Sequence, residues 1–254
     1  MSYIEDLKKI YNLEIKNWRR RYRELSDDEW VAAVNIMMTW SGKKSWDKEP
    51  DIYEKKILKR LNDIATNPIS KREKVVLDAG CGYGYLLNKL WKIGFRNLYG
   101  LDLSQKCIDI CCSRFDFLAA KGYSGLINDA GEGIHLTQGN LANSGYESDS
   151  FDLVICTEVL EHVKEPLQVI NEIYRILNSG GVVYFSTPHL DRRQAWDHIN
   201  FFFTNREAEA LNATTNLGEY NIINIVDLFK ESDFKSFEVE LIGMEKFCFI
   251  TAVK

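Results

Sequence analysis

The sequence lacks several features that would assign a chain to a class of protein at once. No apolar run approaches the roughly 18 residues needed to span a bilayer, and the first residues, MSYIEDLKKIYNLEIKNW, are amphipathic and charged rather than an apolar signal core. Internal repeats and low-complexity segments are also missing. We therefore expect a cytoplasmic protein without a membrane span.

The cysteines provide neither a zinc site of paired CxxC motifs nor the density of a secreted disulfide scaffold. We expect reduced, mostly buried thiols at Cys81, Cys107, Cys111, Cys112, Cys156 and Cys248. A net charge of -5 gives no general reason to expect nucleic acid or an anionic membrane as a partner. One local exception is the basic cluster KNWRRRYRE (16–24), which is either a solvated helix face or a phosphate contact.

With 254 residues, 45% of them hydrophobic, the chain has the size and composition of one globular domain with a modest extension. Helical spacing of apolar residues up to about Ala65 predicts an N-terminal helical cap over residues 1–70, which ends in a linker around Asn67 to Ser70. The main domain is predicted to occupy residues 71–254, with an insertion near 189–225. Within it, we expect residues 205–220 to form a lid or an oligomer contact.

Short apolar segments alternate with helix-length segments along the main domain, and the last two read as an adjacent pair. We predict strands at 75–79, 97–103, 134–139, 151–157, 182–187, 237–243 and 247–253. This alternation predicts an α/β fold, with a doubly wound, mostly parallel seven-stranded sheet and an antiparallel edge. A helix is expected to start near Glu165 and Pro166 and to end near Asn178 and Gly180.

Three glycines at every second position follow the first predicted strand, in VLDAGCGYGYLL (76–87). Glycines this close together are costly inside an element but useful where the backbone turns sharply and approaches a ligand. In a doubly wound sheet, ligands bind beyond the carboxyl ends of the strands at the switch point, where this loop falls. The stretch therefore predicts a ligand loop.

Asp102 ends the second predicted strand, and an acid there can accept hydrogen bonds from both hydroxyls of a ribose. A dinucleotide needs a pyrophosphate seat, and its GxGxxG fingerprint would place a glycine where Tyr85 stands. The nearby carboxylate of Asp78 disfavours an anion and suits the ammonium of a methionine moiety. An adenosine that carries an amino acid fits better than a dinucleotide.

Two long stretches, VLDAGCGYGYLLNKLWKIGFRNLYGLDLS (76–104) and GNLANSGYESDSFDLVICTEVLEHVKEPLQVINEIYRILNSGGVVYFSTP (139–188), resemble the class I S-adenosylmethionine-dependent methyltransferases. They are most similar to the branch that contains the ubiquinone-biosynthesis O-methyltransferases and many sugar and natural-product enzymes. The resemblance implies a Rossmann-like methyltransferase fold and S-adenosyl-L-methionine as the cofactor. It is much less specific for the substrate.

The resemblance also implies roles for individual residues. Gly80 and Gly82 would pack against the methionine part, Asp102 would hold the ribose, Leu103 would flank the adenine, and Asn140 would meet its exocyclic amine. The family often has Asp at position 140, but the side-chain carbonyl of Asn accepts the same hydrogen bond. The implied cofactor-binding set is Asp78, Gly80, Cys81, Gly82, Asp102, Leu103, Asn140, Leu141, Cys156 and Thr157.

A second informative stretch, TEVLEHVKEP, contains Glu158, Glu161 and His162, which would share one face of a helical turn. Buried together, these groups need a partner, which is either a divalent cation or hydrogen bonds to the cofactor and the next loop. With His198 in a DHxF-like context, they resemble the metal ligands of the small-RNA 3'-terminal 2'-O-methyltransferases. The metal, Mg²⁺ or Mn²⁺, would bind Glu158, Glu161, His162 and His198; His189 is a competing fourth ligand, a general base or a polar loop residue.

Methyl transfer from a sulfonium is a direct displacement, so the protein must align the acceptor and remove its proton. His162, His189 and His198 are the candidate bases. We expect O-methylation of a small hydroxylated metabolite of quinone, phenol, sugar or natural-product type, with nucleic acid an unfavoured partner. Two alternatives are a metal-assisted 2'-O-methyltransferase of RNA ends, which would need Arg19, Arg20, Arg21 and Arg23 to face the site, and a non-catalytic cofactor-binding subunit.

Overall fold

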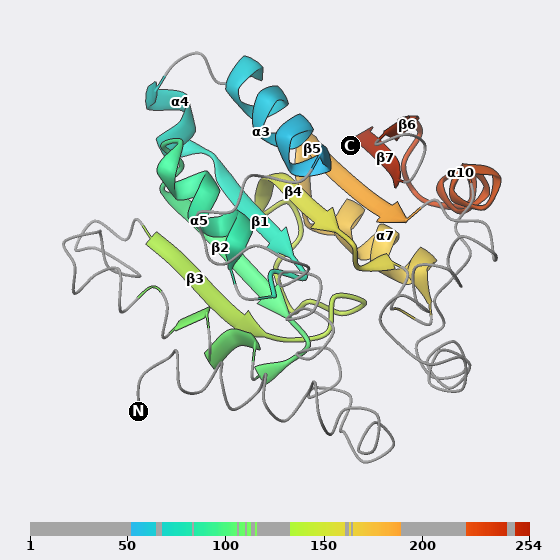
Figure 1. Ribbon diagram of the computed structural model, residues 1–254. Helices are drawn as coiled ribbons and strands as arrows, with labels where there is room; N and C mark the ends of the chain where they lie inside the picture. Colours follow the sequence, from blue (N-terminus) through green and yellow to red (C-terminus); the bar gives the residue numbers. More distant parts are fainter. Residues whose placement is uncertain are drawn as a thin grey trace, which may run out of the picture.

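The structure, a computed structural model, is shown in Figure 1. It describes residues 52–64, 68–82, 84–105, 107–109, 111–112, 115, 133–160, 163, 165–188, 222–242 and 247–254. Most of the predicted N-terminal cap at 1–70, including the basic cluster at 16–24, and most of the predicted insertion at 189–225 lie outside these residues, so the predicted division into domains stays a prediction.

A seven-stranded sheet forms the centre of the molecule, in the order β3-β2-β1-β4-β5-β7-β6. Its strands are β1 (Val75–Ala79), β2 (Asn97–Asp102), β3 (Gly133–Gln138), β4 (Phe151–Thr157), β5 (Leu177–Pro188), β6 (Ser236–Ile242) and β7 (Phe247–Val253). The first five strands are parallel, and β7 lies antiparallel between β5 and β6. The predicted mostly parallel sheet with an antiparallel edge is confirmed.

Helices cover both faces of this sheet (Figure 1). They are α3 (Ile52–Ile64), α4 (Pro68–Glu73), α5 (Tyr85–Lys92), α7 (Pro166–Ile176) and α10 (Ile222–Glu231). Among the helices of the described residues, none has the length and apolarity needed to cross a membrane.

Neighbouring residues of each central strand pack into opposite cores because side chains alternate across a strand. In β1, for example, Val76 packs with α3 and α5, whereas Leu77 packs with α7 and α10. Both side chains are fully buried. A parallel sheet buried on both faces explains why the strands appear in the sequence as short continuous apolar runs.

Two expected boundaries are wrong. A helix, α4, begins at Pro68, where the sequence suggested a linker; the fixed φ of proline suits the first position of a helix. Helix α7 begins at Pro166 as expected but ends at Ile176, and β5 starts at once with Leu177 paired to Phe151. Gly180, with φ of 76°, therefore lies in the strand segment rather than at a helix end.

Candidate cofactor site

The glycine loop leaves the carboxyl end of β1, beside the point where the sheet order reverses between β1 and β4. Gly80, Gly82 and Gly84 have φ of 85°, 50° and 73°, a left-handed region that costs other residues strain. The backbone N–H groups of Gly80 and Cys81 donate to the Leu101 carbonyl, at 2.7 and 3.0 Å. These two hydrogen bonds hold the glycine loop against the carboxyl end of β2.

Close packing also restricts two of these glycines. A Cβ atom on Gly80 would lie 2.3 Å from Cγ2 of Val159, and one on Gly84 would lie 2.3 Å from Sγ of Cys111. Contacts under 3.0 Å are essentially never seen for real Cβ atoms. The loop therefore packs between the segment after β4 and the helical residues after β2.

Asp102 is buried, with 4% of its surface exposed, and its carboxylate lies between two backbone turns. Oδ2 accepts a hydrogen bond from the Gly82 N–H at 2.8 Å, and Oδ1 accepts one from the Ser104 N–H at 2.9 Å. These two bonds hold the acid predicted to bind a ribose in a single orientation, directly against the glycine loop.

The residues predicted to surround adenine lie at the same edge of the sheet. The Gly139 N–H donates to the Asp102 carbonyl at 2.9 Å, which brings the ends of β2 and β3 together. Leu103 is 46% exposed, a large value for a leucine, whereas Leu141 is buried. Asn140 is exposed, and its Oδ1 accepts a hydrogen bond from the Ala142 N–H at 2.9 Å.

At the end of β4, Cys156 is fully buried in the core and Thr157 is half-buried beside Ser186 of β5. Glu158 follows with φ of 55°, which is uncommon for a residue other than glycine. Its backbone N–H donates to the Ser186 carbonyl at 2.9 Å, and its Oε1 accepts a hydrogen bond from the Ser186 hydroxyl at 2.8 Å. The helical turn predicted from the spacing is therefore wrong at Glu158, which β5 holds in a left-handed conformation.

Several predicted functional residues lie outside the described residues: Glu161, His162, His189, His198 and the arginines Arg19, Arg20, Arg21 and Arg23. Of the proposed metal ligands, only Glu158 is described. Within the described part of the chain, no group of three or more His, Cys, Asp or Glu side chains is arranged to hold a metal ion.

None of the six cysteines forms a disulfide in the structure, and all but Cys112 are buried, as expected for most of these thiols. A hydrogen bond between the Cys81 and Cys111 thiols, together with burial, raises the pKa of the Cys81 thiol well above its usual value. A thiol is a nucleophile only as the thiolate. Cys81, although part of the glycine loop, is therefore suited to packing rather than to covalent catalysis.

Sequence reasoning missed the partners that fix the site: Val159 and Cys111 against the glycines, Ser104 on Asp102, and Ser186 on Glu158. These contacts join residues that are mostly far apart in the chain. Ser104 was the one with a local signal, because a serine two residues after a strand-end acid is placed to cap the helical residues that follow it. Its hydroxyl accepts a hydrogen bond from the Cys107 N–H at 3.3 Å.

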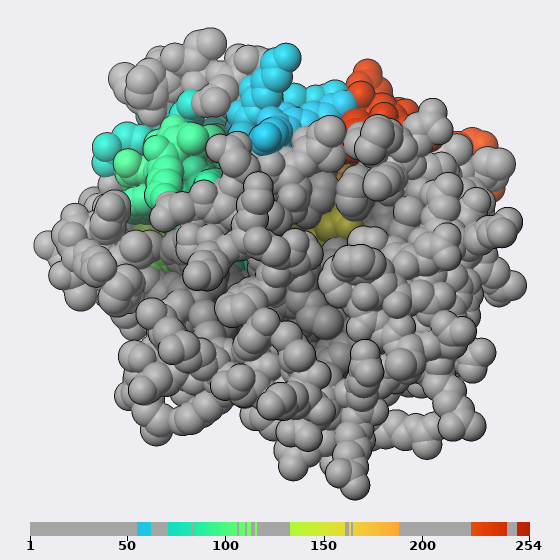
Figure 2. Space-filling model, in the orientation of Figure 1, coloured from blue at the N-terminus to red at the C-terminus, as the bar shows by residue number. Residues whose placement is uncertain are grey.

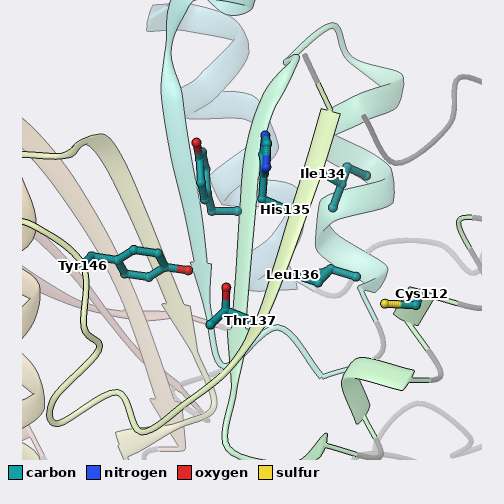
Figure 3. Close-up of a pocket in the computed structure, with 7 residues that line it drawn as sticks. Cys112, Ile134, His135, Leu136, Thr137 and Tyr146 are labelled. Carbon is teal, nitrogen blue, oxygen red and sulfur yellow. The ribbon is translucent and has the colours of Figure 1, made fainter. Parts of the chain in front are cut away.

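A cavity of about 430 Å³ lies along the edge strand β3, apart from the predicted cofactor residues. Figure 3 shows His135, Thr137 and Tyr146 on one side of this strand, and Ile134, Leu136 and Cys112 on the other. The ring of His135 stacks on Tyr99 at 4.5 Å, which is a packing role. Successive residues of β3 point to opposite faces of the sheet, so the lining residues do not face a single enclosed space. The cavity is a hollow that wraps around the edge of the sheet, and we assign it no ligand.

A sheet of this order, with a glycine loop and a strand-end acid at its switch point, defines a Rossmann-like α/β protein. The methyltransferase domain family matches residues 51–235, and the chain belongs to this family.

Among relatives, the chain is 30% identical over 173 residues to the ubiquinone biosynthesis O-methyltransferase of Yersinia pestis (strain Pestoides F), which covers 66% of this chain and 63% of that protein. It is 29% identical over 157 residues to the protein of that name from Proteus mirabilis (strain HI4320). This alignment covers 59% of this chain and 57% of that protein. The chain thus spans about three fifths of the length of these relatives.

Solved structures show the same fold at lower identity. The PH0226 protein from Pyrococcus horikoshii OT3 aligns with a TM-score of 0.60 and 18% identity over 85% of this chain and 97% of that one. A SAM-dependent methyltransferase from Aquifex aeolicus aligns with a TM-score of 0.55 and 14% identity over 97% of both chains. A Haemonchus contortus phosphoethanolamine N-methyltransferase was solved with phosphomonomethylethanolamine and S-adenosylhomocysteine. It aligns with a TM-score of 0.57 and 17% identity over 79% of this chain and 52% of that one.

Proposed function

We propose that this protein is an S-adenosylmethionine-dependent methyltransferase that methylates a hydroxyl group of a small molecule. The observation that carries the proposal is the contact between Asp102 and Gly82, because it joins a ribose-binding acid to a glycine loop at the switch point of the sheet. Family membership supports methyl transfer, and the names of the relatives support an oxygen acceptor.

In this proposal, the cofactor lies across the carboxyl ends of β1 to β4. Asp78, Gly80, Cys81 and Gly82 surround the methionine part together with Cys156 and Thr157. Asp102 receives the ribose hydroxyls, and Leu103, Asn140 and Leu141 surround the adenine. The position of Asn140 and Leu103 beside Asp102 supports this assignment, because ribose and adenine are joined by one bond.

The bound cofactor supplies the methyl group, and the chain supplies alignment and a proton acceptor. We propose that the acceptor is a small hydroxylated metabolite and that its proton passes to one of His162, His189 and His198. A divalent ion at Glu158, Glu161, His162 and His198 is an additional proposal; carboxylate oxygens such as those of Glu158 suit Mg²⁺. Titration of Mg²⁺ into the protein saturated with S-adenosylhomocysteine tests it, and equal binding by wild type, Glu161→Ala and His198→Ala would exclude these ligands.

Calorimetric titration with S-adenosylhomocysteine tests the cofactor proposal. In Asp102→Asn, the amide cannot accept both backbone hydrogen bonds, so we expect the affinity to fall by about tenfold or more. Asp233→Asn is a matched control, since that exposed acid lies after α10 and only its backbone N–H bonds to Asn171. No binding by wild type, or equal binding by Asp102→Asn, would contradict the proposal.

Acceptor class is tested separately, by transfer of a labelled methyl group from S-adenosylmethionine to catechols, phenols, sugars and RNA ends. We expect transfer to a small hydroxylated compound. Transfer to RNA alone, or to amines alone, would exclude the acceptor proposed here.

A further inference from the structure

The segment 139–150, which joins β3 to β4, forms no helix along its length, all of which is described. Its second and third residues, Asn140 and Leu141, are two of the three residues that the proposed function places at the adenine. A loop without regular structure loses conformational entropy when it orders around a ligand, unless the protein has already fixed it. Two residues of α7, Glu172 and Arg175, hold this loop, and we call them the α7 clamp.

Glu172 receives four hydrogen bonds. Its Oε1 accepts from the Ser144 N–H at 2.9 Å, from the Ser144 hydroxyl at 2.6 Å and from Nη2 of Arg175 at 2.8 Å; its Oε2 accepts from Nε of Arg175 at 2.8 Å. The Arg175 guanidinium, followed by the Ser144 contacts, lowers the pKa of Glu172 to about 2. Three of these four hydrogen bonds are accepted by Oε1 and one by Oε2, and all four donors belong to Ser144 and Arg175.

Arg175 extends the clamp along the loop. Besides its fork onto Glu172, it donates from Nη2 to the Tyr146 carbonyl at 2.7 Å and from Nη1 to the Ser148 hydroxyl at 3.1 Å. The loop is thus held at every second residue from Ser144 to Ser148. Further along, the Ser150 N–H donates to the Ile176 carbonyl at 2.8 Å, so the loop meets the end of α7 directly.

The clamp reaches Asn140 through a closed turn. The Asn143 N–H donates to the Asn140 carbonyl at 2.9 Å, and the Ala142 N–H donates to Oδ1 of Asn140 at 2.9 Å. Ser144, the first residue held by Glu172, follows this turn directly. Leu141 is anchored differently, by burial in the hydrophobic core. The orientation of the exposed Asn140 side chain therefore depends on the turn and on the clamp that fixes its end.

We propose that Glu172 and Arg175 are positioning residues for adenine recognition, which hold the Asn140 side chain where it accepts a hydrogen bond from the exocyclic amine. This inference rests on the proposed function and adds two residues that touch neither the cofactor nor the reacting atoms. The α7 clamp contributes affinity for one group of the ligand, because the loop is ordered before the ligand arrives.

The test compares two ligands by calorimetry: S-adenosylhomocysteine, and its analogue in which unsubstituted purine replaces adenine and the exocyclic amine is missing. We expect Glu172→Gln to weaken S-adenosylhomocysteine by roughly fivefold to tenfold, the range of one lost hydrogen bond. Binding of the purine analogue should change by less than about twofold, since that ligand has no amine to lose. Arg175→Lys should change the two affinities in the same way as Glu172→Gln. An ammonium cannot reproduce the paired hydrogen bonds that a planar guanidinium gives to a carboxylate.

Asp227→Asn serves as the matched control, because it removes an exposed pair at i and i+3, with Lys230 at 3.4 Å, on a different helix. It should leave both affinities unchanged. If the clamp variants bound both ligands with equally reduced affinity, or with unchanged affinity, the inference would be wrong but the proposed function would stand. Wild-type protein that binds neither ligand would overturn the proposed function and the inference with it. Circular dichroism identifies a variant that fails to fold. In that case Ser144→Ala takes its place under the same expectations; it keeps the Glu172–Arg175 pair and removes the 2.6 Å hydrogen bond to Glu172 and the 3.3 Å hydrogen bond from the Tyr146 N–H.

Discussion

Position 80 requires glycine for two separable reasons, backbone conformation and close packing. Gly180 shares only the first, since its φ of 76° is close to the 85° of Gly80 but a Cβ there would have no atom within 4 Å. At Gly80, a Cβ would lie 2.3 Å from Val159. Comparing alanine at the two positions therefore separates the effect of packing from that of backbone strain.

We predict that Gly80→Ala lowers the affinity for S-adenosylhomocysteine by at least about tenfold, because the loop must move away from Val159. Gly180→Ala should lower stability by about 1 kcal/mol, the usual cost of a left-handed alanine, and leave affinity unchanged. Calorimetry and urea unfolding of both variants measure the two effects. Equal affinities would mean that the packing of Gly80 is irrelevant to the site.

The lowered pKa of Glu172 predicts how the stability of the protein depends on pH. Its pKa is lowered from 4.5 to about 2 in the folded protein, chiefly by Arg175. A lowered carboxyl pKa stabilises the fold above the unfolded value, and this contribution is lost as the pH falls from about 4.5 towards 2. The full shift would correspond to about 3 to 4 kcal/mol. Because Arg175 is 39% exposed and screened by solvent, we expect a contribution of about 2 kcal/mol.

Urea unfolding of wild type and Glu172→Gln at several pH values measures this contribution. We expect the difference in unfolding free energy between them to be largest near pH 6 and to shrink below pH 4.5, because the wild-type carboxylate becomes protonated. A difference that is constant from pH 6 to pH 3 would show that the charge of Glu172 does not stabilise the fold.

At the residue scale, sequence reasoning predicted positions better than partners. Asp102 lies at the end of β2 as predicted, since an acid after an apolar strand marks the edge of the sheet. Its bond to Gly82 was not predicted, because the bond depends on a left-handed turn 20 residues away. Glu158 was misjudged because the spacing assumes a helix, whereas two hydrogen bonds to Ser186 of β5 hold it outside one.

At the scale of elements, α3 is joined to the antiparallel edge of the sheet mainly by charged side chains. Arg60 donates to Glu240 of β6 at 2.7 Å and to Thr251 of β7, and its guanidinium lies 5.3 Å from the ring centre of Phe249. Lys56 also pairs with Glu240. Ile57 and Leu61 anchor the same helix in the core, and Figure 2 shows the surface of α3, in blue, beside that of the edge strands, in red.

We predict that Arg60→Ala destabilises the protein by about 1 to 2 kcal/mol. The charge-assisted hydrogen bonds of Arg60 favour the upper end of this range. The partial exposure of Arg60 and Glu240 favours the lower end. Lys59→Ala, at an exposed position of the same helix, should change stability by less than about 0.5 kcal/mol. Urea unfolding gives both values. An effect of Arg60→Ala as small as that of Lys59→Ala would mean that the apolar residues alone dock α3.

Elements were predictable from the sequence where their apolar pattern decided the outcome. The limits of β1, β4 and β7 are as predicted, because buried parallel strands and their antiparallel neighbour form compact apolar runs. The early start of β5 was not predictable, since Asn178 and Gly180 are typical of helix ends and only pairing with β4 makes a strand of this segment. Local propensity was overridden by tertiary structure there.

At the scale of the whole molecule, strand alternation was enough to predict the fold class, because parallel strands need crossover connections. The strand order β3-β2-β1-β4-β5-β7-β6 comes from the structure alone, because doubly wound sheets occur in more than one order. It brings the carboxyl ends of β1 to β4 to one edge of the sheet. The acceptor does not follow from it: methyl transfer needs alignment rather than a particular nucleophile in the protein, so no motif in the sequence encodes the acceptor.

Because the proposed cofactor would contact the ends of β1, β2, β3 and β4, its binding should stabilise the whole domain rather than one loop. A ligand that binds only the native state contributes RT ln(1 + [L]/Kd), or about 2.7 kcal/mol at a hundred times Kd. For a chain of this size, that corresponds to a rise in Tm of roughly 5 to 10 °C. We predict this rise for wild-type protein with S-adenosylhomocysteine, and a much smaller rise for Asp102→Asn at the same ligand concentration. Thermal unfolding followed by circular dichroism measures both. If Tm rose equally in the two proteins, the ligand would bind without the ribose contact; if it rose in neither, the cofactor assignment would be wrong.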